Sequence, residues 1–283
     1  MLSLTLIAQR ARTAARHLAL LSAESKNEFL LAIAGALEKN AGVILKANKK
    51  DLLNGKRKGL DAGLMDRLML DEKRIQNIAD DVRNVAQLPD YVGSIIEERT
   101  MPNGLRIERV RVPLGVIGMI YEARPNVTVD AAVLSLKSGN AVILKGGSDA
   151  LYSNRTLVQV IQQALAPFDQ LSPVKFLTDA VQLLDSTDRA VTKRFLQMKG
   201  AIDVIIPRGG KGLIDFVSET ARVPVIETGA SPVHTYVDES ADIEKAAAIV
   251  LNAKLRRTSI CNTLDTLLVH KKIAAAFFRI FIA

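Results

Sequence analysis

The chain has 283 residues, 48% of them apolar, which is enough for one large or two ordinary domains with a sizeable core. A single cysteine allows no internal disulfide, three histidines disfavour a metal site, and no apolar run approaches the roughly 18 residues of a membrane span, so we expect a cytoplasmic protein. The net charge of +8 is spread along the chain without interleaved aromatic residues, which favours anionic small molecules as ligands over nucleic acid or a membrane.

The sequence up to about residue 88 has the spacing of amphipathic helices. Ser22 is a predicted N-cap, and the helix after it carries apolar residues at helical spacing: Phe29, Leu30, Ile33, Ala34 and Leu37. A further helix is predicted over 44–53, and Asp71 is the predicted N-cap of another. Pro89 ends this pattern. A Pro-Asn-Gly turn between extended segments then predicts a β-hairpin over about 94–110, a device that often reaches over a neighbouring subunit or domain.

From residue 113 short apolar runs alternate with segments of helical length. The runs are 116–120, 141–144, 174–177, 204–206 and 223–226. Nearly continuous apolar runs are typical of strands buried on both faces, and their alternation with helices predicts a doubly wound parallel sheet. A strand at 235–237, a helix at 243–251 and a strand at 266–269 begin a second unit. We therefore expect domains at 1–228 and 229–283.

Two of the predicted strands end in glycines and cations. Lys145, Gly146 and Gly147 follow one strand, and Arg208, Gly209 and Gly210 follow another. Because ligands of parallel sheets bind at the carboxyl ends of the strands, the two turns together favour an extended anion such as a dinucleotide. The alternative is a pair of ordinary surface turns. Neither turn is a Walker A loop, and no GxGxxG follows the first strand.

The lone thiol, Cys261, lies close to the end of the sequence. Three cations precede it: Lys254, Arg256 and Arg257. Nearby positive charge lowers a thiol pKa, and Asn262 offers an amide donor beside the sulfur, which favours a nucleophile. The alternative is a small buried side chain, the usual role of a free cysteine. Glu227, at the end of a predicted strand, is a candidate acid or base.

The segment 112–130 resembles the signature of the gamma-glutamyl phosphate reductases, a family of the aldehyde dehydrogenase superfamily. The likeness extends from about residue 3 to about residue 276. Further matching segments are 64–68, 78–83, 138–147, 206–210, 236–240 and 252–254. The resemblance implies an aldehyde dehydrogenase-like α/β fold, in which N-terminal helices and a doubly wound cofactor domain precede an incomplete α/β catalytic domain.

The resemblance also implies an activity, the second step of proline biosynthesis. It is the NADPH-dependent reduction of L-glutamyl 5-phosphate to L-glutamate 5-semialdehyde and phosphate through a cysteine thioester. Ser259, Cys261 and Asn262 match the family's Ser-x-Cys-Asn, which makes Cys261 the implied nucleophile. Asn126 is implied to hold the oxyanion together with the Cys261 amide. Arg124 is the adjacent candidate, and it equally suits the substrate phosphate.

The implied cofactor is NADPH/NADP. Lys145 matches a superfamily lysine at the adenine ribose. Ser148 stands where many NAD enzymes of the superfamily carry a glutamate, which leaves room for a 2′-phosphate, although Asp149 next to it weakens this argument. The cofactor residues implied in this way are Lys145, Gly146, Gly147, Ser148, Arg208, Gly209, Gly210 and Glu227.

The sequence departs from the family around the nucleophile and in its last residues. Residues 231–233 differ from the family's pattern, as do Leu255, Arg256 and Thr258, and the family continues well beyond residue 283. We therefore expect a chain truncated at its C-terminus, with exposed apolar surface and without full activity. The alternatives are an NADP-binding fragment without turnover, or an aldehyde-oxidising dehydrogenase with Glu227 as its base. The implied partners are a glutamate 5-kinase that delivers the substrate, and other copies of the chain, the latter doubtful for a truncated one.

Overall fold

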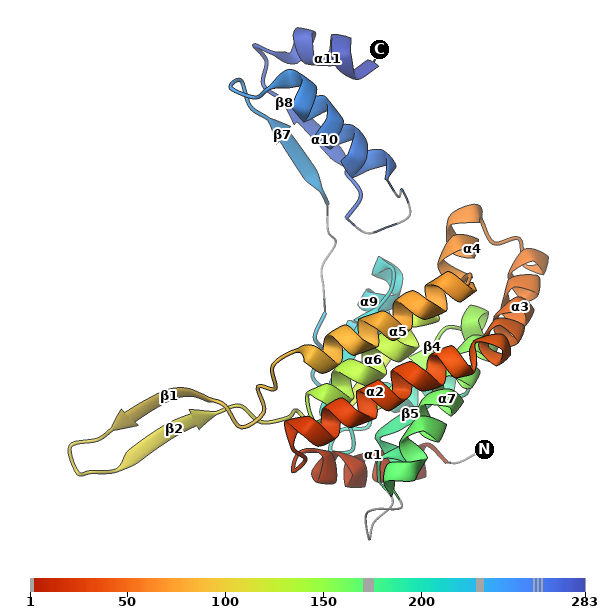
Figure 1. Cartoon of the computed structure of the whole chain (residues 1–283), viewed down its shortest axis with the longest axis vertical. Coiled ribbons are helices and arrows are strands. Elements are labelled where there is room, and N and C mark those ends of the chain that lie inside the picture. The colour runs from red at the N-terminus through yellow and green to blue at the C-terminus, as the bar shows by residue number, and fades with distance from the viewer. Residues whose placement is uncertain are drawn as a thin grey trace. The chain divides into compact units, whose positions relative to one another are not determined.

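The structure is a computed structural model that describes residues 3–169, 176–227, 232–256, 258, 260 and 262–282. The chain divides into two compact units, Met1–Glu227 and Thr228–Ala283, whose residues can be followed in Figure 1 by the colour scale. Within the described residues, no helix is both long and apolar enough to cross a membrane.

The first unit begins with five helices. They are α1 (Leu4–Leu18), α2 (Ala23–Lys39), α3 (Ala41–Arg57), α4 (Ala62–Leu68) and α5 (Glu72–Gln87). Both predicted N-caps are confirmed: Ser22 Oγ accepts a hydrogen bond from Ser25 N at 3.3 Å, and Asp71 Oδ1 accepts one from Arg74 N at 2.7 Å. Helix α3 is about a turn longer at each end than predicted: small and apolar residues begin it before Ile44, and polar and charged residues continue it past Leu53.

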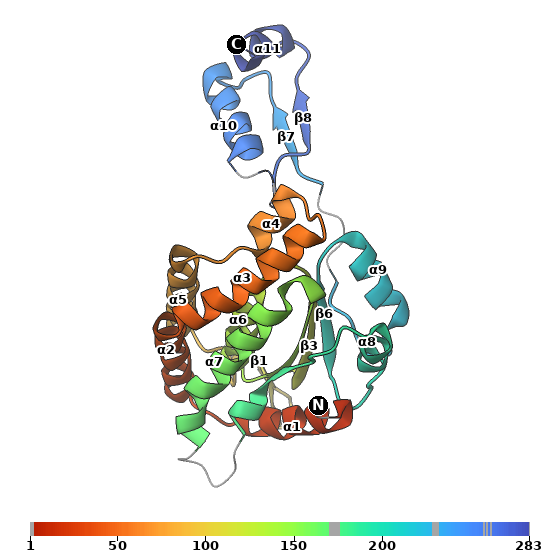
Figure 2. The ribbon, with the colours of Figure 1, turned by 90° about the vertical axis from the view of Figure 1, so that its right-hand side faces the viewer.

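A four-stranded parallel sheet follows, and the predicted fold class is confirmed. Its strands are β3 (Val116–Tyr121), β4 (Ala141–Gly146), β5 (Val181–Leu183) and β6 (Val204–Arg208), in the order β5-β4-β3-β6. The helices between and after them are α6 (Asn126–Lys137), α7 (Leu151–Asp169), α8 (Arg189–Leu196) and α9 (Lys211–Thr220), with short 3-10 turns η1 (Ser148–Ala150) and η2 (Thr178–Ala180). The strand order reverses between β3 and β6, so right-handed crossovers place α6 and α7 on one face and α8 on the other. Figure 2 shows α6 and α7 together, with α8 and α9 on the β6 side.

The core of this unit is continuous from the sheet into the helices. Strands β3 and β4 bury almost every side chain, as their uninterrupted apolar sequences predict. Helices α2 and α5 pack on α6, and α3 packs on α7, so the N-terminal helices form a second layer over one side of the sheet. The sheet is therefore held rigidly enough to fix the geometry of the loops at its edges.

Two predicted strands differ in the structure. Of the run 174–177, residues 174 and 175 lie outside the described part, and Phe176 and Leu177 precede η2 instead of forming a strand. The reason is Asp169, whose carboxylate accepts hydrogen bonds from the backbone amides of Phe176, Leu177 and Thr178 and so removes them from any ladder. The sheet's strand is β5, a few residues later. The run 223–226 makes a single bridge, between Val225 and Ile205 of β6.

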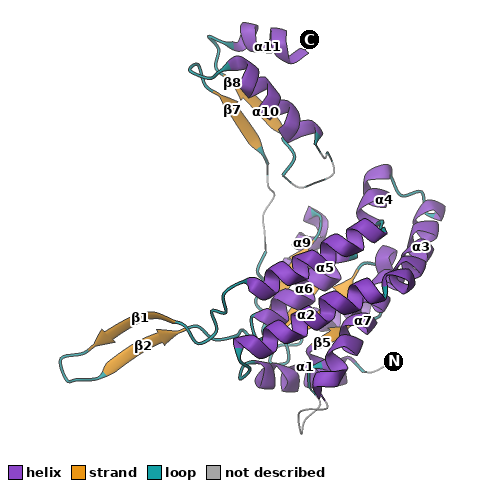
Figure 3. Ribbon diagram, viewed as in Figure 1, coloured by secondary structure: helices purple, strands orange, loops and turns teal. Residues whose placement is uncertain are grey.

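An antiparallel hairpin, β1 (Ile95–Thr100) with β2 (Arg106–Val110), leaves the first unit between α5 and β3. Its turn contains Gly104 with φ +83°, a conformation that favours glycine. Residues of both strands are almost all exposed, and in Figure 3 the hairpin projects away from the helices around it.

The second unit contains β7 (His234–Val237), α10 (Ile243–Leu255), β8 (Thr266–Val269) and α11 (Ala274–Ile282). Strands β7 and β8 pair in parallel, and α10 is the helix that connects them (Figure 3). The unit has its own small core: Val237, Ala247, Val250, Leu264 and Phe277. The predicted strand at 266–269 is found with the same limits.

Candidate functional site

A buried hydrogen-bond network lies behind the carboxyl edge of the sheet. Tyr121, the last residue of β3, shares a hydrogen bond of 2.7 Å between its hydroxyl and Thr128 Oγ1 of α6. Thr128 in turn donates to Asn154 Oδ1 of α7 at 2.9 Å. Burial raises the pKa of Tyr121, so its hydroxyl keeps its proton. A Cβ on Gly146 would lie 2.1 Å from Asn154 Nδ2, so this network leaves room only for glycine at the end of β4.

Lys145 lies at the carboxyl end of β4 and is half-buried. Its ammonium donates a hydrogen bond of 2.9 Å to the carbonyl of Gly146. Burial lowers the pKa of Lys145, while the carboxylate of Asp185, just beyond β5, acts in the opposite direction. Gly147 is next in the turn, and a Cβ there would make only ordinary contacts, the nearest with Glu122 Cα at 3.5 Å.

Glu122, directly after β3, connects the end of that strand to the end of β6 by hydrogen bonds. Gly210 N donates a hydrogen bond of 2.9 Å to Glu122 Oε2, and Glu122 N donates one of 3.2 Å to the carbonyl of Arg208. A Cβ on Gly209 would lie 2.6 Å from Glu122 Oε2, so this approach requires glycine. The amide of Gly210 is therefore bound to Glu122 and is not free for a phosphate in this conformation, in contrast to what the sequence led us to expect. Arg208 is exposed, and its side chain makes no hydrogen bond or ion pair with the described residues.

Ser148 and Asp149 form the corner between β4 and α7. Ser148 is exposed, and the carboxylate of Asp149 forms an ion pair of 2.7 Å with Lys58 Nζ, just after α3. Sequence reasoning missed Lys58 and Glu122. The only signal for Glu122 was its position directly after the first strand of the sheet, and Lys58 had none.

Arg124 and Asn126 follow β3 and begin α6. Asn126 Nδ2 donates a hydrogen bond of 3.0 Å to Asp130 Oδ2, one turn further along the helix. Burial raises the pKa of Asp130 to about 6, the Asn126 hydrogen bond opposes this, and the charge of Asp81 adds to it. The amide group of Asn126 is thus oriented by a carboxyl group that titrates close to neutral pH.

Glu227 ends the first unit, where it is exposed and accepts a hydrogen bond from the hydroxyl of Ser218 on α9. Asn262 belongs to the second unit and is exposed in a turn. The predicted nucleophile Cys261 and its neighbour Ser259 lie outside the described residues. Lys254, one of the three cations before Cys261, donates to the carbonyl of Leu264 at 2.8 Å. Among the described residues, no three His, Asp or Glu side chains are grouped as metal ligands.

The carboxyl edge of the sheet fits an anionic dinucleotide in its chemistry. Lys145 and Arg208 bring positive charge to the ends of β4 and β6, the two strands that flank β3. The turn at Gly147 has room for a side chain without a clash, the nearest contact of a Cβ there being 3.5 Å. The edge also lies where the strand order reverses, the place at which doubly wound sheets bind nucleotides. The arrangement accommodates such a ligand. For the backbone amide of Gly210 to take part, the Glu122 carboxylate must release it or share its hydrogen bond with the ligand.

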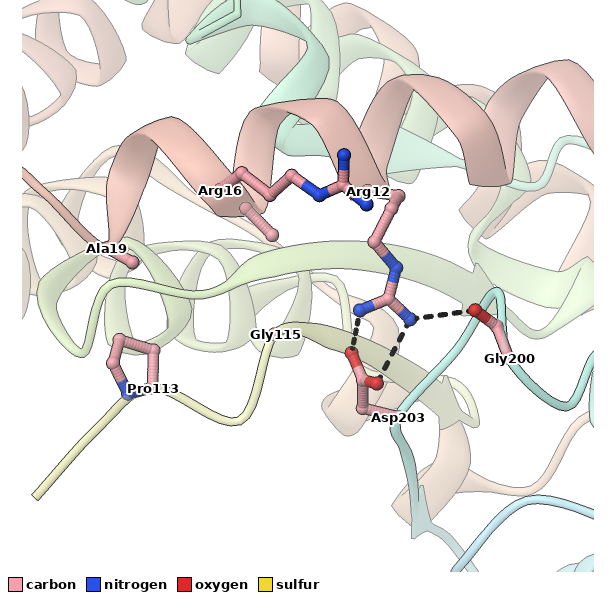
Figure 4. Close-up of a pocket in the computed structure, with 8 residues that line it drawn as sticks. Arg12, Arg16, Ala19, Pro113, Gly115, Gly200 and Asp203 are labelled. Atoms are coloured by element: carbon pink, nitrogen blue, oxygen red, sulfur yellow. Dashed lines mark hydrogen bonds and ion pairs between the residues drawn. The ribbon is translucent and has the colours of Figure 1, made fainter.

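The opposite edge of the sheet holds a cavity of about 470 Å³. Figure 4 shows Arg12 of α1 reaching across it to Asp203, with hydrogen bonds of 2.7 and 3.0 Å to the two carboxylate oxygens, and to the carbonyl of Gly200 at 3.2 Å. Asp203 Oδ2 also accepts from Val116 N at 2.7 Å. These groups satisfy one another and fasten α1 to the amino ends of β3 and β6, so this cavity is a product of packing.

The family model for the aldehyde dehydrogenase family matches residues 4–283. The chain therefore belongs to the aldehyde dehydrogenase family. Among curated proteins, it is 54% identical over 269 residues to the gamma-glutamyl phosphate reductase of Moorella thermoacetica, an alignment that covers 95% of this chain and 63% of that protein. The resemblance to the gamma-glutamyl phosphate reductases is thus confirmed, and the chain spans less than two thirds of that relative's length.

Solved structures give the same picture. The gamma-glutamyl phosphate reductase of Thermotoga maritima matches with a TM-score of 0.88 at 41% identity, over 98% of this chain and 66% of that one. An engineered glycolyl-CoA reductase with bound NADP+ matches at 21% identity with a TM-score of 0.70, over 98% of this chain and 58% of that one. At that identity the likeness shows the fold alone.

Proposed function

We propose that this chain carries the cofactor platform and the nucleophile of an enzyme that reduces L-glutamyl 5-phosphate to L-glutamate 5-semialdehyde and phosphate. The observation that carries the proposal is the 54% identity, over 95% of the chain, to a protein named gamma-glutamyl phosphate reductase. The reaction belongs to proline biosynthesis, and its substrate is an acyl phosphate that a glutamate kinase must supply. The excess of basic residues suits two anionic ligands.

Cys261 is the proposed nucleophile. Its thiolate attacks the acyl carbon, a carbon–sulfur bond forms, the carbon–oxygen bond to phosphate breaks, and phosphate leaves with the bonding electron pair. The negative charge that develops on the acyl oxygen is held by the side-chain amide of Asn126. The hydrogen bond that Asn126 Nδ2 donates to Asp130 Oδ2 supports this role, because it fixes which way the Asn126 amide group points. Ser259 and Asn262 are assigned to the site by their match to the family's Ser-x-Cys-Asn, and Arg124 is the proposed ligand of the substrate phosphate.

The carboxyl edge of the parallel sheet is the proposed site for NADPH, which when bound supplies the hydride that reduces the thioester. Lys145 binds the adenine ribose, and Gly146, Gly147 and Ser148 admit the cofactor at the end of β4. The exposed guanidinium of Arg208 and the turn at Gly209 and Gly210 approach it from β6, and Glu227 lies at the end of the same unit. The shared fold of the NADP+-bound glycolyl-CoA reductase supports a nicotinamide cofactor at such an edge.

Two measurements on the 283-residue chain test the proposal. The first titrates NADPH, and the second follows NADP+ reduction with glutamate 5-semialdehyde and phosphate, which is the reverse reaction. Binding with turnover that Cys261→Ala abolishes supports the whole proposal. Binding without turnover leaves the cofactor platform and rejects catalysis by this chain alone. Turnover of simple aldehydes with NAD+, lost in Glu227→Gln, identifies an aldehyde-oxidising enzyme instead.

A further inference from the structure

An ion pair from the N-terminal helices reaches the corner where the proposed cofactor site begins. Lys58 Nζ lies 2.7 Å from Asp149 Oδ1, although the two residues are 91 positions apart in the sequence. Asp149 directly follows Ser148, the position at which an acid would bind ribose hydroxyls in an NAD enzyme. Lys58 directly follows α3, a helix that belongs to none of the βαβ units.

Buried hydrogen bonds hold α3 at this corner. Asp51, which is 1% exposed, accepts hydrogen bonds from Tyr152 N at 3.1 Å, Ser153 N at 2.7 Å and Ser153 Oγ at 2.6 Å. Asn48, also 1% exposed, donates to Ser153 Oγ at 3.0 Å. The start of α7 is thus fastened to the middle of α3. Because α3 continues from there to Lys58, the position of the lysine relative to Asp149 is set by the fold and not only by the ion pair.

The two carboxylates at this corner, those of Asp149 and Asp51, are already engaged and are not available to bind ribose hydroxyls. The pairing with Lys58 neutralises Asp149 and occupies one of its carboxylate oxygens. A second ammonium, that of Lys50, lies 5.4 Å from the centre of the Tyr152 ring at the start of α7. Asp51 also lies close to Asp149; burial raises its pKa, and both of its carboxylate oxygens accept hydrogen bonds from α7. The charge at this corner is therefore neutral or positive, which favours a dianionic phosphate. The carboxylate that could accept a hydrogen bond from a ribose hydroxyl, that of Asp149, is already paired with Lys58.

We propose that Lys58 is the residue that makes the cofactor site selective for NADP(H) over NAD(H). Its ammonium binds the 2′-phosphate of the adenine ribose, and its pairing with Asp149 withholds that carboxylate from the 2′-hydroxyl of NAD(H). The inference rests on the proposed function, since it concerns the cofactor of the same site. It also resolves the objection that Asp149 raises against a 2′-phosphate beside Ser148.

The test is a pair of binding titrations, NADPH and NADH, on the 283-residue chain and its variants. The chain contains no tryptophan, so the fluorescence of the reduced nicotinamide reports binding without protein background from indole. In Lys58→Met we expect NADPH to bind about tenfold more weakly, with NADH unchanged or slightly tighter, since one charge-assisted contact is lost. Lys56→Met is the matched control: it removes the same charge from the exposed end of α3 and should leave both affinities unchanged.

A second variant separates Lys58 from its partner. In Asp149→Asn the ammonium is released and a negative charge is removed, so NADPH should bind at least as tightly as to the unchanged chain. If Asp149 itself held the ribose, both cofactors would instead bind more weakly. The inference is overturned if Lys58→Met weakens both cofactors equally or weakens neither. An unchanged chain that binds neither cofactor rejects the proposed cofactor function itself, which is a different result.

Discussion

The two edges of the parallel sheet use their charged side chains in opposite ways. At the amino edge Arg12, Asp203 and the amide of Val116 form a closed set in which the carboxylate accepts all three of its near donors. At the carboxyl edge Arg208 is exposed without a partner in the described part of the chain, and Lys145 donates only to the carbonyl of the next residue. Groups that satisfy one another contribute to stability, whereas an exposed cation without a protein partner remains available to an anionic ligand.

Backbone geometry reinforces this difference. Gly115 precedes β3 with φ +116°, and a Cβ there would lie 2.2 Å from Asp203 Oδ2. Gly147 follows β4, and a Cβ there would make only ordinary contacts, the nearest at 3.5 Å. One glycine is required by the protein's own packing, and the other is required only if something outside the protein approaches it.

Removing the carboxylate at the amino edge should have the largest effect. Asp203→Ala leaves the part-buried guanidinium of Arg12 and the amide of Val116 without their acceptor, so we expect a loss of about 3 kcal/mol in the free energy of unfolding. Urea unfolding followed by circular dichroism measures it. Asp215→Ala, which breaks the exposed pair with Lys211, is the control and should cost under about 0.5 kcal/mol. An equal loss in the free energy of unfolding for the two variants would show that the contacts of Asp203 at the amino edge do not contribute specially to stability.

The two glycines provide the next test. Gly115→Ala must adopt a strained backbone and displace Asp203, so we expect it to unfold about 2 kcal/mol more easily. Gly147→Ala should leave the free energy of unfolding within about 0.5 kcal/mol of its original value, because the added methyl group makes only ordinary contacts, but weaken NADPH binding, because that group occupies space in the proposed cofactor turn. Thermal melts and NADPH titrations on both variants distinguish the two roles. A stable Gly147→Ala with unaltered NADPH affinity would remove the turn from the cofactor site.

At the carboxyl edge, the raised pKa of Asp130 makes the stability of the fold depend on pH. The pKa of Asp130 is raised to about 6 in the folded chain, so the folded state favours the protonated form. Its stability contribution is therefore complete below about pH 4 and is lost as pH rises through about 6, with an upper limit of about 3 kcal/mol from the size of the shift. Asp130→Asn should flatten this fall in stability, measured by urea unfolding from pH 4 to 7 (roughly the interval between the two pKa values). Asp51, shifted in the same direction by burial, will leave part of the slope.

The strands at the centre of the sheet could be predicted from the sequence because both of their faces are buried. Strands β3, β4 and β6 lie within one or two residues of the apolar runs that predicted them. Strand β5 could not be placed, since the apolar residues before it give their amides to Asp169 and leave only a three-residue strand. Local apolar patterns thus determine long buried strands, while a single side-chain acceptor can override them in a short one.

The candidate site likewise has residues that the sequence could place and contacts that it could not reveal. The sequence could place Lys145 and Arg208 at the ends of strands, and a parallel sheet necessarily brings such ends to one edge. It could not reveal that Glu122 accepts from Gly210, 88 positions away, or that Lys58 pairs with Asp149. Contacts between remote side chains have no periodic signal, so the electrostatics of the edge emerge only from the folded structure.

The smallest expected effect on stability, and the sharpest contrast with Asp203, is at Arg208. Because its side chain has no partner in the described residues, Arg208→Gln should change the free energy of unfolding by less than about 0.5 kcal/mol. If the carboxyl edge holds the cofactor, the same change should weaken NADPH binding by about three- to tenfold, and added salt should reduce that difference because the contact is exposed. Lys211→Gln, three residues further and already paired with Asp215, is the matched control and should bind NADPH nearly as before. Equal losses in the two variants would mean that only the overall positive charge of α9 and its neighbours attracts the cofactor, and that Arg208 makes no direct contact with it.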